Sequence, residues 1–278
     1  SRNESLSVLC NRDKVDTRGS WFMTLYNKKL IQKRFSAHLH TYNQYAVAQN
    51  EICARLSDIL DAFAETPVKR AIEIGAGTGF LTRHLLKRFA EGEWFLNDIA
   101  CEAEPFLADY VKESRIVNVS YLWGDAENIV LPRHLDLVAT ASTIQWFDDI
   151  EKFITGLDVV SGGILALSTF GTENFIEIRE ATGGEGLLYP SMEELKKWVE
   201  QAGYTILYHE DYKRILAFAN PLEVLRHIKL TGVNGIRSVV WTREVLNRFC
   251  ERYVKYFSCE GGVSLTYNPL ILIARKVR

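Results

Sequence analysis

Three glycines and one acidic residue lie within seven positions and form the pattern in this chain best suited to chemistry. Glu73-Ile-Gly-Ala-Gly-Thr-Gly79 follows a short apolar run and precedes leucines at helical spacing, which indicates a strand, a tight turn and a helix start. Glycine is needed where a ligand lies directly against the backbone, because a Cβ would block it. The spacing differs from the G-x-G-x-x-G of dinucleotide enzymes, and the Glu73 carboxylate would repel a pyrophosphate. We therefore favour a ligand with cationic groups over an ordinary turn that contains glycines by chance.

A second acidic residue follows at the distance expected for ribose recognition. Asp98 ends the next predicted strand, 19 residues after Gly79. In doubly wound nucleotide folds, an acid about 20 residues beyond the glycines accepts hydrogen bonds from the ribose hydroxyls. Asp125 and Ala126 follow the third predicted strand, where we expect the adenine edge. S-adenosylmethionine carries an ammonium, a sulfonium and a ribose diol, so it is the predicted cofactor.

These motifs lie at the ends of strands that alternate with helices. The predicted strands are 70–74, 94–98, 117–122, 135–142, 164–169, 204–209 and 263–274. The fourth strand is nearly all apolar, as expected for a parallel strand covered on both faces. The alternation predicts an α/β fold with a doubly wound, mostly parallel seven-stranded sheet. N-terminal helices over 28–63 precede it, and a helical cap is inserted at about 211–261 between the last two strands.

Two capping boxes predict helix starts C-terminal to the glycine motif. Asp148 with Glu151 predicts one N-terminus, and Ser191 with Glu194 predicts another. Within the insertion, Pro221 at a first helical position indicates a third start.

Composition bounds the remaining possibilities. The 278 residues are 47% hydrophobic and carry a net charge of −2, so a large core is expected and no general nucleic-acid signature is present. The five cysteines are odd in number and scattered, which we interpret as reduced thiols in a cytoplasmic protein. The histidines form no metal-binding pattern, so we predict no metal. Neither an apolar run long enough to span a membrane nor a signal peptide is found, so no membrane association is expected.

The N-terminal residues are set apart from the domain. We place the α/β domain at 28–278 and interpret 1–27 as a disordered leader, since residues 1–22 are polar and without periodicity. The end of an upstream fused segment and an expression-derived remnant are the alternatives. Met23 is a plausible natural start.

Taken in order, the motifs resemble those of class I S-adenosylmethionine-dependent methyltransferases over about residues 35–276. Glu73 to Gly79 is that family's first motif, and Asp98 matches its ribose-binding acid. Four further segments resemble the malonyl-acyl-carrier-protein O-methyltransferases of biotin synthesis. They are Lys33-Arg-Phe-Ser with Tyr42-Asn-x-x-Ala46-x-x-x-Gln49, Ala141-Ser-Thr-Ile-Gln145-Trp146-Phe, Leu225-Arg226-x-x-Lys229-x-Thr231-Gly232-x-Asn234, and Leu265-Thr266-Tyr267. Gln-Trp also occurs in the similar trans-aconitate methyltransferases, so that segment alone does not separate the two families.

The resemblance implies methylation of the free carboxylate of a malonyl group carried by acyl carrier protein or coenzyme A. Such a carboxylate is ionised at neutral pH, so the reaction requires no general base. The site must instead desolvate the carboxylate and align it with the methyl group. We predict Arg226 and Lys229 as the cations that hold it, because a charged donor binds a carboxylate strongly. Candidate hydroxyl donors are Tyr42, Tyr189, Thr169 and Tyr267.

Three residues after the fourth strand complete the predicted site, because open α/β sheets bind ligands at that edge. We expect Gln145 to orient the substrate, Trp146 to form an apolar wall near the methyl group, and Ser142 to contact the methionine part of the cofactor. The alternative for Trp146 is a core position. For the cations and tyrosines above, the alternatives are solvated or core side chains.

The predicted partner is acyl carrier protein. Residues 211–260 hold nine Lys or Arg against five acids, and a basic cap would attract an acidic carrier. A solvated helix face is the alternative explanation, and no nucleic acid is expected. Two other functions stay open: methylation of another small acid or a quinone precursor, and binding of the cofactor without catalysis.

Overall fold

The computed structural model describes residues 28–64, 67–184, 188–231 and 241–277. The predicted leader at 1–27 lies outside these residues, as do Gly232 and Asn234. Within the described ranges, no helix has the length and apolar character needed to cross a membrane.

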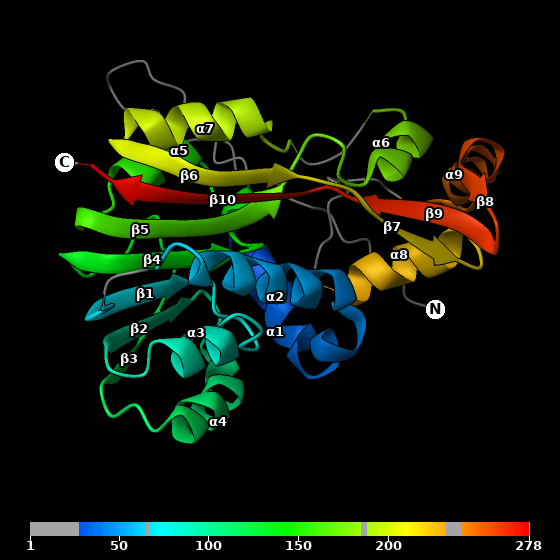
Figure 1. Ribbon diagram of the computed structural model, residues 1–278. Coiled ribbons are helices and arrows are strands. Elements are labelled where there is room, and N and C mark those ends of the chain that lie inside the picture. The colour runs from blue at the N-terminus through cyan, green and yellow to red at the C-terminus, as the bar shows by residue number, and fades with distance from the viewer. Residues whose placement is uncertain (1–27, 65–66, 185–187, 232–240, 278) are drawn as a thin grey trace, which may run out of the picture.

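A seven-stranded sheet forms the centre of the molecule, as predicted, in the order β3-β2-β1-β4-β5-β10-β6 (Figure 1). Its strands are β1 (Arg70–Ile74), β2 (Glu93–Asp98), β3 (Val119–Trp123), β4 (Leu135–Ala141), β5 (Val159–Phe170), β6 (Tyr204–Asp211) and β10 (Pro269–Lys276). Only β10 runs antiparallel to its neighbours. The strand order reverses between β1 and β4, and such a switch point leaves a crevice at the carboxyl ends of the strands.

Helices cover both faces of this sheet. One face packs on α2 (Val47–Asp61), α3 (Thr82–Arg88) and α4 (Glu104–Ser114), and the other on α5 (Ile150–Thr155) and α7 (Met192–Gln201). Successive strand residues point to opposite faces. Ala71 of β1 therefore joins the core with Leu85 of α3, whereas Ile72 joins Leu195 of α7. Burial on both faces explains why the strands read as continuous apolar runs.

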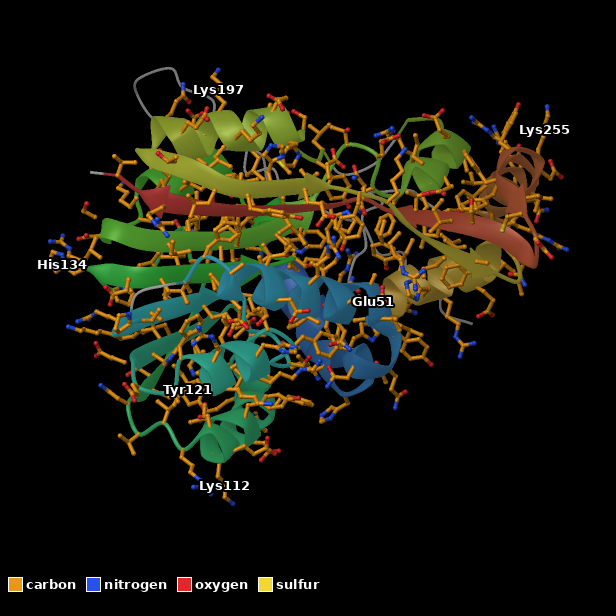
Figure 2. The ribbon with its side chains drawn as sticks, in the orientation of Figure 1. Glu51, Lys112, Tyr121, His134, Lys197 and Lys255 are labelled. Atoms are coloured by element: carbon orange, nitrogen blue, oxygen red, sulfur yellow. The ribbon has the colours of Figure 1, made fainter. Side chains whose placement is uncertain are left out.

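The N-terminal segment forms two helices instead of one. Helix α1 (Lys28–Tyr45) ends at Ala46, which is fully buried and has a non-helical conformation, and α2 begins directly after it. The bend lets α1 reach the carboxyl edge of the sheet while α2 stays packed on it. Glu51 of α2 is labelled in Figure 2. Its Oε2 lies 2.9 Å from Arg214 Nε, and this ion pair joins α2 to the segment that follows β6.

The predicted insertion contains more than helices. It has α8 (Pro221–Leu230), which begins at the predicted Pro221, and α9 (Arg243–Phe257). It also contributes β7 (Arg214–Phe218) and β8 (Ser258–Cys259). These two strands flank β9 (Gly262–Tyr267) in a second, antiparallel sheet. Helices α6 (Ile176–Thr182), α8 and α9 pack against it. The expectation of a purely helical cap was therefore incomplete.

The predicted strand 263–274 is wrong as a single element, because it divides at Asn268 into β9 and β10, one in each sheet. Hydrogen bonds of the Asn268 side chain fix the point at which the two strands separate. Its Nδ2 donates to Asp211 Oδ1 at 2.6 Å and to the Tyr212 carbonyl at 3.0 Å, and its Oδ1 accepts from the Glu173 main-chain N–H at 3.1 Å. One amide thus joins three chain segments at the boundary between the sheets.

One predicted capping box is confirmed and the other is displaced. Ser191 and Glu194 exchange the two expected hydrogen bonds at the start of α7. At α5 the cap is Asp149, whose carboxylate accepts from the main-chain N–H three residues on at 2.9 Å. Asp148 is not the cap, because its own N–H donates to the Glu127 carboxylate at 2.8 Å. The prediction for Asp148 was wrong by one residue.

We expect Asn268→Ala to lower the free energy of unfolding by about 1–3 kcal/mol, because the three hydrogen bonds of this buried side chain are lost. Urea denaturation followed by circular dichroism measures the change. Asn118→Ala is the control, since Asn118 is exposed and its substitution should stay within about 0.5 kcal/mol. Equal stability of the two variants would show that Asn268 does not hold the sheets together.

Candidate functional site

The loop after β1 presents bare backbone to a pocket at the carboxyl edge of the sheet. Gly75 has φ +73°, and a Cβ there would overlap the Thr143 side chain. Gly77 has φ +54°, and its Cβ would lie 3.3 Å from the ring of Phe35. Both positions have a backbone conformation that favours glycine. A side chain at either position would also fill space next to the pocket.

Asp98 is a buried acid of the site that main-chain hydrogen bonds hold in place. It ends β2 and is only 5% exposed. Its Oδ2 accepts from the Gly77 N–H and its Oδ1 from the Ala100 N–H, both at 2.8 Å. Burial raises the pKa of Asp98 to about 6, against the opposing effect of these hydrogen bonds. A carboxylate has about four acceptor positions, so lone pairs remain for a ligand diol.

Glu73 lies beneath the same loop. Its carboxylate accepts from Thr82 Oγ1 at 2.7 Å. Burial raises the pKa of Glu73 to about 8, more than the Thr82 hydrogen bond lowers it, and the charge of Asp98 raises it further. At neutral pH the group is mostly protonated when no ligand is present. A cationic ligand would favour the ionised form.

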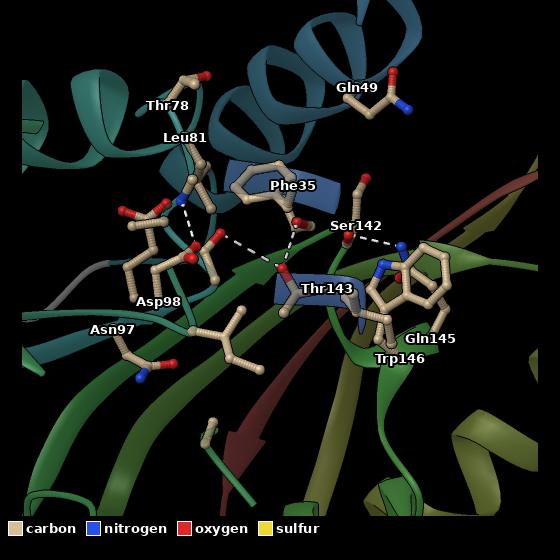
Figure 3. A pocket seen from close by; sticks show the side chains of 18 of the residues that line it. Phe35, Gln49, Thr78, Leu81, Asn97, Asp98, Ser142, Thr143, Gln145 and Trp146 are labelled. Atoms are coloured by element: carbon tan, nitrogen blue, oxygen red, sulfur yellow. Dashed lines mark hydrogen bonds between the residues drawn. The ribbon is translucent and has the colours of Figure 1, made fainter. Parts of the chain in front are cut away.

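The pocket brings together most of the predicted site. Those predicted residues that line it are Tyr42, Glu73, Gly75, Gly77, Asp98, Asp125, Ala126, Ser142, Gln145 and Trp146. They come from α1 and from the loops after β1, β2, β3 and β4, which is the edge expected from the switch point. Figure 3 shows Asp98 on one side of the pocket and Gln145 with Trp146 on the other.

Ser142 and Gln145 shape the middle of the pocket. Ser142 has φ +53°, unusual for a residue other than glycine, and its buried Oγ has no hydrogen-bond partner among the described residues. Such a hydroxyl at a strand end is suited to a ligand contact. Gln145 is held at both amide atoms, since its Nε2 donates to the Ser142 carbonyl at 2.6 Å and its Oε1 accepts from Thr169 Oγ1 at 3.3 Å.

Four other predicted residues lie apart from this constellation. Tyr189 lines a neighbouring hollow and packs edge-on against Phe170, which forms part of the main pocket wall. Arg226 and Lys229 lie on the exposed side of α8, and the Arg226 side chain is 64% exposed beside Glu223. The structure therefore does not bring the two predicted cations to the pocket. Tyr267 is buried behind it, with its hydroxyl 2.8 Å from His227 Nε2.

Sequence reasoning missed the part that α1 plays. Lys28 Nζ donates to Glu127 at 2.6 Å and lies 3.4 Å from Asp125, over the ring of Phe147. Together with Phe35, it covers the side of the pocket expected to hold adenine. The basic cluster at the start of α1 was visible in the sequence, but its acidic partners are about a hundred residues away. No local pattern could have shown the pairing.

The donor set fits S-adenosylmethionine. Asp98 can accept from a ribose diol, Ser142 offers an unpaired hydroxyl, Glu73 offers latent negative charge, and Gly75 and Gly77 leave room for the ligand. Among the described residues, no group of three or more His, Cys, Asp or Glu side chains could hold a metal ion. The pocket can therefore bind a cationic, ribose-bearing ligand beside Asp98. Its second compartment is the opposite side of the same pocket, lined by Gln145 and Trp146.

Comparison with known proteins agrees with this geometry. Residues 72–167 match the family described as "Methyltransferase domain". The chain is 38% identical over 252 residues to the malonyl-[acyl-carrier protein] O-methyltransferase of Haemophilus ducreyi, covering 90% of this chain and 97% of the relative. It is 39% identical over 262 residues to the protein of the same name from Bacteroides thetaiotaomicron, covering 90% and 98%.

Solved structures support the fold. The YcgJ protein of Bacillus subtilis matches with a TM-score of 0.57 at 13% identity, covering 81% of this chain and 99% of that one. A putative methyltransferase from Bacillus halodurans matches with a TM-score of 0.58 at 16% identity, covering 81% and 100%. At these identities the likeness concerns the fold alone, and it confirms the predicted α/β architecture.

Asp98→Ala should weaken S-adenosylmethionine binding by about 1.5–3 kcal/mol, because hydrogen bonds to a charged group are lost. Isothermal titration calorimetry measures the dissociation constant. Asp109→Ala on the exposed side of α4 is the matched control and should bind normally. Unchanged affinity in the Asp98 variant would remove this residue from the cofactor site.

Affinity for S-adenosylmethionine should also rise with pH between about 5 and 8. Binding favours the ionised acids, so Asp98, with a pKa of about 6, and Glu73, with a pKa of about 8, must release protons. As pH falls, we expect affinity to drop by up to about tenfold per pH unit between pH 8 and 6, where Glu73 alone is protonated, and by up to about a hundredfold per unit below pH 6, where both are. The free energy of unfolding of the ligand-free protein should depend on pH in the opposite direction. Raised carboxyl pKa values stabilise the fold at low pH, and this contribution is lost as pH rises.

Calorimetry at several pH values, with Asp98→Asn as the comparison, checks this dependence. The variant should bind weakly and with a flatter profile below pH 6. A pH-independent affinity in the unaltered protein would contradict the linkage.

Proposed function

The chain belongs to the family of malonyl-[acyl-carrier protein] O-methyltransferases, and from this premise we propose that it methylates the free carboxylate of a malonyl group held by an acyl carrier protein. The observation that carries the proposal is 38–39% identity over 90% of the chain with relatives of that activity. The product would be a malonyl methyl ester, which the family resemblance assigns to the synthesis of biotin precursors. The cofactor is S-adenosylmethionine, in agreement with the methyltransferase domain and the pocket.

The described residues can perform this reaction without acid–base groups. When bound, S-adenosylmethionine supplies an electrophilic methyl group. A malonyl carboxylate is already ionised at neutral pH, so no residue needs to remove a proton from it. Asp98 and the glycine loop hold the adenosyl part, while Trp146 and Phe170 exclude water from the neighbouring compartment. Alignment of the two reactants supplies most of the rate enhancement in such a site.

Carrier recognition is assigned to exposed cations near the pocket. Helix α8 ends beside Thr231, which lines the pocket, and it packs against α1, which also lines it. Arg226 and Lys229 lie on the exposed side of that helix, and further cations such as Lys255 lie on α9 (Figure 2). Acyl carrier proteins are acidic, so this surface would increase their association rate. We therefore assign Arg226 and Lys229 to carrier docking in place of the carboxylate contact expected from the sequence.

Mass spectrometry of malonyl-acyl carrier protein after incubation with the enzyme and S-adenosylmethionine tests the function. We expect a gain of one methyl group, and no gain on acetyl-acyl carrier protein, which lacks the free carboxylate. Absence of methylation, with cofactor binding confirmed separately, would refute this substrate. Another small acid, a quinone precursor or binding without catalysis would then be the functions to test.

Charge reversal tests the docking surface. Arg226→Glu combined with Lys229→Glu should lower kcat/KM for malonyl-acyl carrier protein about tenfold or more at low salt, with a smaller effect as salt screens the surface. Activity on malonyl-coenzyme A should change little. Lys112→Glu on α4, an exposed lysine elsewhere on the molecule (Figure 2), is the control. An equal loss on both substrates would place the cations at the malonyl carboxylate instead of the carrier.

A further inference from the structure

Gln49 is a buried polar residue whose amide is unpaired. It lies in the first turn of α2 and is only 2% exposed. Neither its Nε2 nor its Oε1 has a hydrogen-bond partner in the described part of the chain. Its side chain lines the pocket. Buried side-chain amides are nearly always hydrogen-bonded, so an unpaired one at a pocket wall points to a ligand.

The amide lies in the compartment expected for the substrate. Figure 3 shows Gln49 on the same side as Gln145 and Trp146, away from Asp98. Thr231, at the end of α8, lines the pocket as well. Each amide atom of Gln145 already makes a hydrogen bond, to Ser142 or to Thr169. Among the described residues, by contrast, the Gln49 amide makes none, so all of its donors and acceptors are available to a ligand.

Two buried side chains, Tyr267 and His227, form a pair next to Gln49. The Tyr267 hydroxyl lies 2.8 Å from His227 Nε2 and close to the Gln49 amide, although not within hydrogen-bonding geometry of that amide. Burial lowers the pKa of His227 to about 4 and raises that of Tyr267, so both are neutral at physiological pH. The wall behind the compartment thus offers polar groups without charge.

Cations are scarce around the pocket. Of the described side chains that line it, Lys28 is the single Lys or Arg, and it is paired with Glu127 and Asp125 on the adenine side. Arg226 and Lys229 lie on the exposed side of α8. A carboxylate in the substrate compartment would therefore meet neutral donors among the described residues.

We propose that Gln49 is the substrate-positioning residue whose Nε2 donates a hydrogen bond to the malonyl carboxylate. The inference rests on the proposed function. In the transfer, a carboxylate oxygen forms the new O–CH3 bond, the S–CH3 bond breaks, and its electron pair stays on sulfur in S-adenosylhomocysteine. No proton moves.

A neutral donor suits this chemistry better than a guanidinium. The carboxylate loses its negative charge as the ester forms, so a cation would stabilise the ground state more than the transition state and slow the step. An amide orients the carboxylate while leaving it nucleophilic. The same amide lies away from Asp98, which would hold the adenosyl part of the cofactor on the opposite side of the pocket.

Gln49→Met tests the proposal, because methionine has nearly the same shape and no donor. We expect kcat/KM for malonyl-acyl carrier protein to fall about 10- to 100-fold, the range for a lost hydrogen bond to a charged group. Affinity for S-adenosylmethionine should stay unchanged. The melting temperature should be equal or higher, because an unpaired buried amide is removed. Gln49→Glu should lose at least as much activity through repulsion of the carboxylate.

Tyr204→Phe is the matched control. Its hydroxyl is also buried and lacks a partner among the described residues, but Tyr204 lies on β6, outside the pocket lining. Its kinetics should equal those of the unaltered enzyme.

The outcomes separate this inference from the function on which it rests. Unaltered kcat/KM in Gln49→Met, with an active parent enzyme, would overturn the role of Gln49 and leave the function intact. If the variant has a lower melting temperature and a weaker affinity for the cofactor as well as lower activity, the role of Gln49 is structural, and the proposal is overturned. An inactive parent enzyme on malonyl-acyl carrier protein would refute the function itself, and this assignment with it.

Discussion

The burial of the Asp98 carboxylate is the constraint on which the rest of the site depends. A desolvated carboxylate is costly unless main-chain or ligand donors surround it. The N–H groups of Gly77 and Ala100 supply two donors and so join the loops after β1 and β2. The glycine loop can take this path only because Gly75 and Gly77 have positive φ and no side chain. The remaining acceptor positions face the pocket, where a ribose diol can use them.

The pocket divides its two tasks between regions of different electrostatic character. Acidic groups gather at the adenosyl side, where α1 covers them through Lys28. Neutral amides, hydroxyls and aromatic rings form the other side, which the second sheet and α8 close through Thr231 and Tyr267. This division suits a reaction in which a charged nucleophile becomes a neutral ester and no proton is transferred.

Sequence reasoning succeeded where a signal is local. Apolar runs ending in Glu73, Asp98 or Ser142 located the strands, and topology alone then placed these strand ends at one edge of the sheet. It failed where long-range packing decides. Asn268 divides an apolar run because its side-chain partners lie on two distant segments, Asp211-Tyr212 and Glu173. Gln49 was noted only as part of a motif, since its lack of partners is visible only once α2 is placed against the pocket.

A crystal structure of the enzyme with S-adenosylhomocysteine and a malonyl thioester tests the central claim most directly. The account predicts the ribose hydroxyls on Asp98 and the malonyl carboxylate within hydrogen-bonding distance of Gln49, facing the sulfur of the cofactor product. A carboxylate bound instead by a guanidinium or ammonium group, or a ribose away from Asp98, would contradict it.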